Sequence, residues 1–146
     1  MQLSTSVIAG GVLFTLAGVA GYFVGESRAQ EKKAAPRIYE LRTYTTLEGR
    51  LPALNARFRD HTMKLFEKHG MQNVMYWIPT DEKLKDNTLI YVISHASRAA
   101  ADVSWENFRK DPEWVKARDA SEADGKIVAK VEAQYMTLTD YSPVAK

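Results

Sequence analysis

The alternation of apolar and polar positions after residue 36 predicts four strands and two helical regions in the order β-α-β-β-α-β. Segments rich in β-branched and aromatic residues favour strands over Arg37–Thr46, Met71–Ile78, Thr88–Ser94 and Lys130–Thr139. This order is typical of the ferredoxin-like fold, an α+β class with a four-stranded antiparallel sheet and its helices on one face. Short right-handed connections place the first and third strands in the centre of the sheet.

The helical regions are predicted by apolar residues that recur three and four positions apart. In Arg50–His69 this stripe consists of Leu51, Leu54, Phe58, Thr62 and Leu65. The second region, Ser97–Lys110, carries Trp105 and Phe108 at the same spacing. Asp111 and Pro112 then interrupt the helix and are suited to start another, as its N-cap and first residue.

Both faces of the predicted sheet carry large apolar side chains. In the first strand, Ile38, Glu40, Arg42 and Tyr44 alternate with Tyr39, Leu41 and Thr43. A sheet that is apolar on both faces needs cover on both, and the helices of one chain cover only one. Since a second copy packed sheet against sheet would bury the other face, we expect a homodimer.

An apolar run of 18 residues without a charge, Val7–Val24, precedes this domain. Ser27 and Ala29 fit cleavage after Ala29, as in an export signal, whereas the length of the run and the lack of a basic start fit an uncleaved membrane anchor. We therefore expect a periplasmic, extracellular or membrane-anchored protein; a cytoplasm-facing domain on an anchor is the alternative. The predicted boundaries are 1–29 for the signal or anchor, 30–36 for a linker, 37–141 for the domain and 142–146 for a tail.

Composition excludes several classes of function. The 20 basic and 18 acidic residues give a net charge of only +2, so we expect no nucleic-acid partner. The absence of cysteine excludes disulfides, thiolate metal sites and a cysteine nucleophile. The three histidines have no zinc-site spacing and no glycine-rich phosphate loop is present, so we predict no metal and no cofactor.

Two segments resemble the NIPSNAP family. Tyr39–Tyr44 (YELRTY) is similar to the opening strand of NIPSNAP domains. Trp105–Trp114 (WENFRKDPEW) is similar to their helix-and-turn signature. The resemblance implies a dimeric α+β barrel, in which two ferredoxin-like sheets close around a shared interior. Related barrels include small monooxygenases, haem-degrading enzymes and stress-response proteins, so the fold alone does not select a function.

Glu40 and Arg42 are the first candidate site residues, because they share one side of a central strand. In a cavity, Arg42 would bind an anionic or carbonyl group and Glu40 would act as acid or base. The alternative is an ion pair at an interface. His61, beside the helix stripe, is either a general base or haem ligand, or a hydrogen-bonded packing residue. His69 and His95 are weaker candidates.

Four tyrosines could line a ligand pocket with apolar walls and polar tips. They are Tyr44, Tyr76, Tyr91 and Tyr135, and the alternative is that they are core aromatics with satisfied hydroxyl groups. The favoured function is a NIPSNAP-like barrel that binds a small apolar molecule or a partner protein. The alternative is a cofactor-independent or haem-using oxygenase or isomerase that acts on a hydrophobic carbonyl substrate in the barrel cavity; a purely structural module is the third hypothesis.

Overall fold

The structure is a computed structural model that describes residues 36–143. The predictions for residues 1–29, and those for parts of the linker and the tail, lie outside the described residues. Within residues 36–143, no helix is both long and apolar enough to cross a membrane. The elements follow the predicted order: β1 (Ile38–Thr46), α1 (Leu51–Arg57), η1 (Phe58–Thr62), α2 (Met63–Lys68), β2 (Gln72–Trp77), β3 (Thr88–His95), α3 (Arg98–Lys110), α4 (Pro112–Ser121) and β4 (Val128–Met136).

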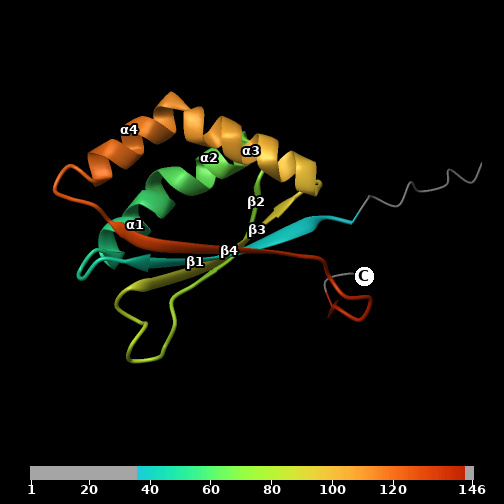
Figure 1. Ribbon diagram of the computed structural model, residues 1–146, viewed down its shortest axis with the longest axis horizontal. Coiled ribbons are helices and arrows are strands. Elements are labelled where there is room, and N and C mark those ends of the chain that lie inside the picture. The colour runs from blue at the N-terminus through green and yellow to red at the C-terminus, as the bar shows by residue number, and fades with distance from the viewer. Residues whose placement is uncertain (1–35, 144–146) are drawn as a thin grey trace, which may run out of the picture. The chain divides into compact units, whose positions relative to one another are not determined.

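The four strands form one antiparallel sheet in the order β2-β3-β1-β4, so the prediction of β1 and β3 as central strands is confirmed. Figure 1 shows every labelled helix on the same side of this sheet. The last strand is Val128–Met136 rather than Lys130–Thr139. It stops at Met136 because the partner of Met136 is Tyr39, one residue from the start of β1, and no paired strand continues beyond that point.

The predicted helix Arg50–His69 is interrupted by a π-helical turn, η1. The Met63 N–H bonds to the Phe58 carbonyl, five residues back, and the Thr62 hydroxyl donates to the Arg57 carbonyl at 3.1 Å. The extra residue widens the turn, so that Phe58 and Thr62 still point into the core. Such turns are rare and often occur at functional sites.

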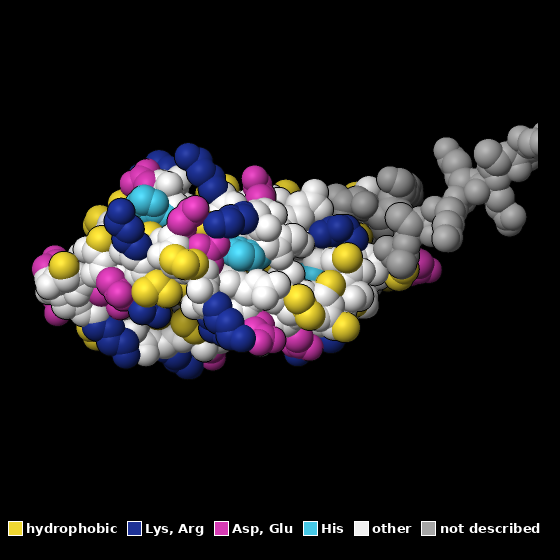
Figure 2. Space-filling view, turned by 90° about the horizontal axis from the view of Figure 1, so that it is seen from above, with side chains coloured by type: hydrophobic (Ala, Val, Ile, Leu, Met, Phe, Trp, Pro, Cys, Tyr) yellow, Lys and Arg dark blue, Asp and Glu magenta, His cyan; other side chains and the backbone are white. Residues whose placement is uncertain are grey.

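The hydrophobic core fills the layer between the helices and the sheet. Its largest fully buried apolar side chains are Tyr91, Phe66, Leu54, Met71, Ile93 and Ile127. Aromatic rings meet edge to face within it; the Phe66 and Trp105 centroids, for example, are 5.4 Å apart. On the outer helix surface, Figure 2 shows acidic and basic side chains intermingled.

The opposite face of the sheet is open and largely apolar. Leu41 pairs with Val92 in the centre of this face, and both are half-buried. Met75, opposite Val92 on β2, is 54% exposed. No helix among residues 36–143 covers these side chains (Figure 1), as the alternation in the sequence predicts.

Asp111 fixes the junction between α3 and α4. One of its carboxylate oxygens accepts the Glu113 N–H at 2.8 Å, so the predicted N-cap is confirmed. The other lies 2.8 Å from Lys68 Nζ and 2.6 Å from His69 Nε2 at the end of α2. The Lys68 ammonium, His69 and this N–H together hold the pKa of Asp111 well below its usual range. Asp111 therefore links three helix ends as a carboxylate.

Replacing Asp111 with alanine should lower the urea midpoint of unfolding, because α4 loses its cap and Lys68 and His69 lose their shared acceptor. The matched control is Asp119→Ala, which removes an exposed carboxylate that pairs with its neighbour Arg118. Urea unfolding followed by circular dichroism compares the two variants. Equal midpoints for both would show that Asp111 does not join the helices.

Candidate functional site

Glu40 lies almost fully buried near the start of β1, on the face that the helices cover; it is 1% exposed. Arg42 Nη1–H donates to its Oε1 at 2.6 Å. Trp105 Nε1–H, from α3, donates to Oε2 at 2.7 Å, and His95 Nε2, from the end of β3, lies 2.9 Å from the same oxygen. Residues from three elements thus converge on one carboxylate; we call Glu40, Arg42, His95 and Trp105 the Glu40 cluster.

The contacts keep Glu40 ionised. Burial alone would raise the pKa of Glu40, but hydrogen bonds from His95 and Trp105 and the charge of Arg42 outweigh it and lower the pKa. Because a carboxylate only accepts hydrogen bonds, the bonded Nε2 of His95 carries a proton. The His95 ring is fully buried, and its Nδ1 has no partner among the described residues.

The Glu40 cluster holds the Arg42 guanidinium in one orientation. Arg42 Cζ lies 4.2 Å from the centre of the Trp105 ring, a stacked cation–π arrangement. Its side chain is 16% exposed, and its Nε has no partner within residues 36–143. Arg42 is therefore held by Glu40 and Trp105, and its Nη2 group, which takes no part in the bond to Glu40, keeps the capacity to donate.

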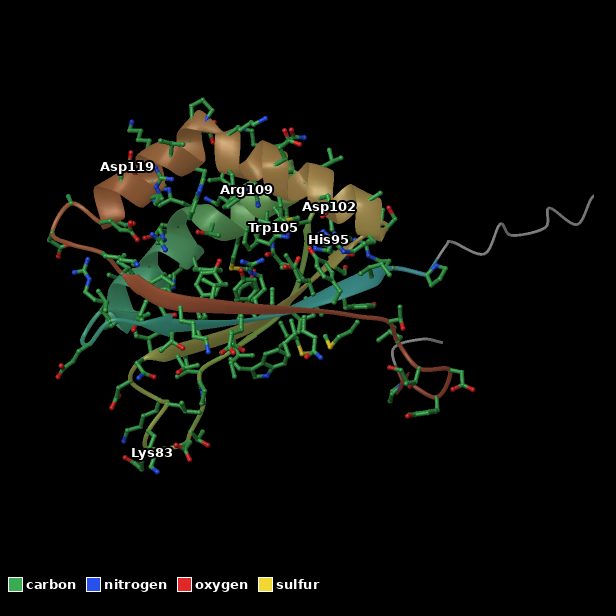
Figure 3. All side chains as sticks on the ribbon, viewed as in Figure 1. Lys83, His95, Asp102, Trp105, Arg109 and Asp119 are labelled. Carbon is green, nitrogen blue, oxygen red and sulfur yellow. The ribbon has the colours of Figure 1, made fainter. Side chains whose placement is uncertain are left out.

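Arg42 and Glu40 border a hollow of about 440 Å³ between α3 and β4. Its other lining residues are Asp102, Trp105, Glu106, Arg109, Ala133 and Tyr135. Figure 3 shows Trp105 and His95 in the layer between α3 and the sheet, below the helix that carries Asp102 and Arg109. We call this the α3–β4 hollow; its volume suits a small-molecule site, for which about 300–1,000 Å³ is usual.

The charges around the α3–β4 hollow leave two guanidinium groups facing it. Asp102 pairs with Arg98, and Glu106 pairs with Lys110 at 2.5 Å. For Arg109, no ion pair occurs within residues 36–143. Asp102, Glu106 and Glu40 are each paired with a cation, so Arg109 is the lining cation without an ion pair within residues 36–143. Together with the N–H groups of Arg42 that Glu40 does not occupy, it favours an anionic or strongly polar group in the hollow.

The four predicted tyrosines do not share one pocket. Tyr135 lines the α3–β4 hollow beside Glu40 and Arg42. Tyr44, Tyr91 and Tyr76 instead form a row across the sheet, with ring centroids 5.4 and 5.3 Å apart. Tyr91 is fully buried, which raises its pKa, so it is a core residue. Tyr76 borders a different groove at the opposite edge of the sheet.

His61 does not lie with the Glu40 cluster. It is exposed on the outer side of η1, beside Asp60, Lys64 and Glu113. The sequence places His61 beside the helix stripe as a site or packing residue, but the side chain points outward because Thr62 takes the inward position of the π-helical turn. Among the described residues, no group of three His, Asp or Glu side chains is placed to hold a metal ion.

The predicted location of the site in a chamber between two sheets also needs correction. Glu40, Arg42 and Tyr44 face the helices, since they alternate with Tyr39 and Leu41, which face the open side. The sequence indicates Trp105 only as an apolar residue at helix spacing and does not reveal the hydrogen bond from its indole to Glu40. The available signal was Glu40 itself, because a carboxylate predicted to point inward requires buried donors.

Comparisons with known proteins identify the family. The NIPSNAP family model matches residues 39–143. A NIPSNAP family protein of unknown function from Agrobacterium tumefaciens is 21% identical with a TM-score of 0.62, and the match covers 74% of this chain and 93% of that one. No curated protein matches the sequence significantly.

Two oxygenases share the fold more distantly. SnoaB, a cofactor-independent oxygenase from Streptomyces nogalater, is 15% identical with a TM-score of 0.50, over 75% of this chain and 99% of that one. The monooxygenase ActVA-Orf6 of Streptomyces coelicolor, solved with nanaomycin D, is 15% identical with a TM-score of 0.53. The match covers 73% of this chain and 91% of that one. In both oxygenases the matched region makes up more than 90% of the solved chain. The chain belongs to the NIPSNAP family and has the ferredoxin-like subunit fold of the dimeric α+β barrels.

Proposed function

We propose that this chain is a homodimeric binding protein for a small organic molecule that presents a carboxylate or carbonyl oxygen to Arg42 in the α3–β4 hollow. The observation that carries the proposal is the Glu40 cluster, which holds a guanidinium stacked on Trp105 at the border of a hollow. A buried ion pair contributes little net stability, because desolvation offsets its attraction. Positioning Arg42 is the role that fits this arrangement best.

The protonation state of Glu40 favours binding over acid–base chemistry. A carboxylate with three hydrogen-bonded neighbours and a lowered pKa holds no proton to donate near neutral pH and is a weak base. The likeness to two oxygenases concerns the fold, and a shared fold does not assign a reaction. The Arg42 Nη2 group, in contrast, is not taken by Glu40 and is suited to donate to a carboxylate or carbonyl oxygen.

The homodimer is proposed from the open face of the sheet. Leu41, Val92 and Met75 lie there without cover from the described helices. Burying apolar surface contributes about 25 cal/mol per Å², and a two-fold arrangement covers both copies at once. Because the Glu40 cluster lies on the other face of the sheet, each subunit of such a dimer would keep its own α3–β4 hollow.

Replacing Arg42 with methionine should abolish binding in the hollow. The polypeptide from Gln30 to Lys146 is screened by saturation-transfer NMR against short-chain carboxylic acids, each paired with the corresponding alcohol. We expect the acids to bind more tightly than the alcohols, since a charge-assisted hydrogen bond contributes about 1.5–3 kcal/mol. Arg42→Lys keeps the charge but loses the fork, so partial binding should remain.

The matched control is Arg118→Met, which removes an exposed guanidinium on α4 that pairs with Asp119. It should leave the binding of the acids unchanged. Equal loss of binding in both variants, or equal binding of acids and alcohols by the unmodified protein, would contradict the proposed role of Arg42. Circular dichroism of each variant excludes unfolding as the cause.

A further inference from the structure

A second concave site lies at the opposite edge of the sheet, between β2 and the continuous helical segment made of α1, η1 and α2. This groove has a volume of about 290 Å³. Its walls are apolar and come from Phe58, Met63, Tyr76, Trp77 and Leu89. We call it the β2 groove. Its size, close to the lower limit of about 300 Å³ for small-molecule pockets, restricts it to one compact ligand.

The π-helical turn builds one wall of the β2 groove. Phe58 and Met63 are five residues apart, a spacing that in a regular α-helix points two side chains in different directions. In η1, the Met63 N–H bonds to the Phe58 carbonyl, so the two residues come to lie one turn above the other. Both therefore line the same groove. The π-helical turn, a rare element, thus shapes one wall of a concave site.

Side-chain contacts hold the groove in shape. The Asn73 amide, on β2, donates to the Met63 carbonyl and to Glu67 Oε1, both at 3.0 Å, and accepts the Tyr76 hydroxyl at 2.5 Å. The Tyr76 and Phe58 rings meet edge to face with centroids 5.9 Å apart. The wall residues are thus fixed without a ligand, which lowers the entropic cost of binding.

Two polar side chains line the β2 groove together with these apolar walls. Asn55 in α1 and Arg59 in η1 are four residues apart along continuous helix, and both line the groove. Within residues 36–143, no carboxylate forms an ion pair with Arg59. Apolar walls with two aromatic rings, together with an amide and a cation that has no ion pair within residues 36–143, are complementary to an apolar ring system that carries one negative charge.

We propose that the β2 groove is a binding site for a fused-ring aromatic carboxylate. Its rings lie against Phe58, Met63 and Tyr76, and its carboxylate accepts hydrogen bonds from Arg59 and Asn55. This site is separate from the α3–β4 hollow, which is on the other edge of the sheet and has polar walls.

The test uses naphthalene-2-carboxylate and, as its neutral counterpart, 2-naphthalenemethanol, titrated calorimetrically into the polypeptide from Gln30 to Lys146. Arg59→Gln should weaken binding of the carboxylate about tenfold, as expected for the loss of a charge-assisted hydrogen bond, and leave the alcohol within about twofold. Met63→Glu, which places a negative charge in the apolar wall, should abolish binding of both compounds.

The control is Lys64→Gln, which removes an exposed cation at the start of α2 that does not line the groove. It should leave both affinities unchanged. No binding of the carboxylate, equal binding by Arg59→Gln, or an equal loss in Lys64→Gln would overturn the proposal. If binding survives Arg59→Gln and disappears in Arg42→Met, the compound occupies the α3–β4 hollow; the β2 groove proposal then fails while the proposed function stands.

Discussion

Replacing Glu40 with alanine is expected to reduce the free energy of unfolding by about 3–5 kcal/mol, the usual cost of removing one partner of a buried ion pair. The substitution leaves the Arg42 charge uncompensated and the Trp105 N–H and the buried His95 ring without their shared acceptor. Since a domain of this size has about 5–15 kcal/mol of stability in total, the effect is large. Urea unfolding of the polypeptide from Gln30 to Lys146, followed by circular dichroism, measures it.

The control is Glu106→Ala, which removes a carboxylate from the same hollow. Glu106 is exposed and pairs with Lys110 across one helical turn, so its loss should change the unfolding free energy by no more than about 0.5 kcal/mol. If Glu40→Ala is no more destabilising than Glu106→Ala, Glu40 does not organise its neighbours.

The difference in unfolding free energy between the unmodified protein and Glu40→Ala should also depend on pH. The pKa of Glu40 is lower in the folded protein than the ordinary value of 4.5, so the folded state prefers the carboxylate. Its contribution is then complete above the unfolded pKa and is lost as pH falls through the folded pKa. When urea unfolding is measured from about pH 7 down to about pH 3, the difference in unfolding free energy should shrink only below the ordinary pKa of 4.5.

Replacing Leu41 with lysine should convert the proposed dimer into a monomer. Leu41 lies in the middle of the open face, paired with Val92, and a two-fold interface would bring two introduced lysines close together. We expect the dissociation constant to rise at least about a hundredfold, because two charges would have to be desolvated. The fold should survive, since this face is open to solvent in the single subunit.

Val103→Lys is the matched control for this experiment. Val103 is apolar and 58% exposed, but lies on α3 rather than on the open face of the sheet. Sedimentation equilibrium should show a dimer for this variant and for the unmodified polypeptide. Dissociation of both variants, or of neither, would contradict the open face as the interface.

The sequence predicts the fold well because its periodicities are clear. The alternation in β1 correctly separates Glu40 and Arg42 from Leu41, and Asp111 with Pro112 marks the start of α4 as predicted. The π-helical turn was not predicted, because Phe58, Thr62 and Leu65 also satisfy the spacing of an ordinary helix. A local insertion of this kind depends on packing against β2 and leaves no pattern in the sequence.

The site was predicted only in part. Glu40, Arg42 and Tyr135 come together, because pairing of β1 with β4 places Tyr135 opposite Glu40. The roles of His95 and Trp105 depend on their contacts with Glu40. His95 is 55 residues and Trp105 is 65 residues away from Glu40 along the chain. Residue type and spacing do not report such contacts. They follow from how α3 lies over the sheet, which only the folded structure provides.

The most direct test of Arg42 as the binding group is NMR observation of the arginine Nε–H signals during addition of a short-chain carboxylate that binds. The Arg42 Nε–H is buried and has no partner within residues 36–143, and its signal is assigned by its loss in Arg42→Lys. We expect this signal to shift progressively and saturate with the carboxylate while that of Arg118 stays constant. Saturable binding that leaves the Arg42 signal unmoved would contradict the proposed site.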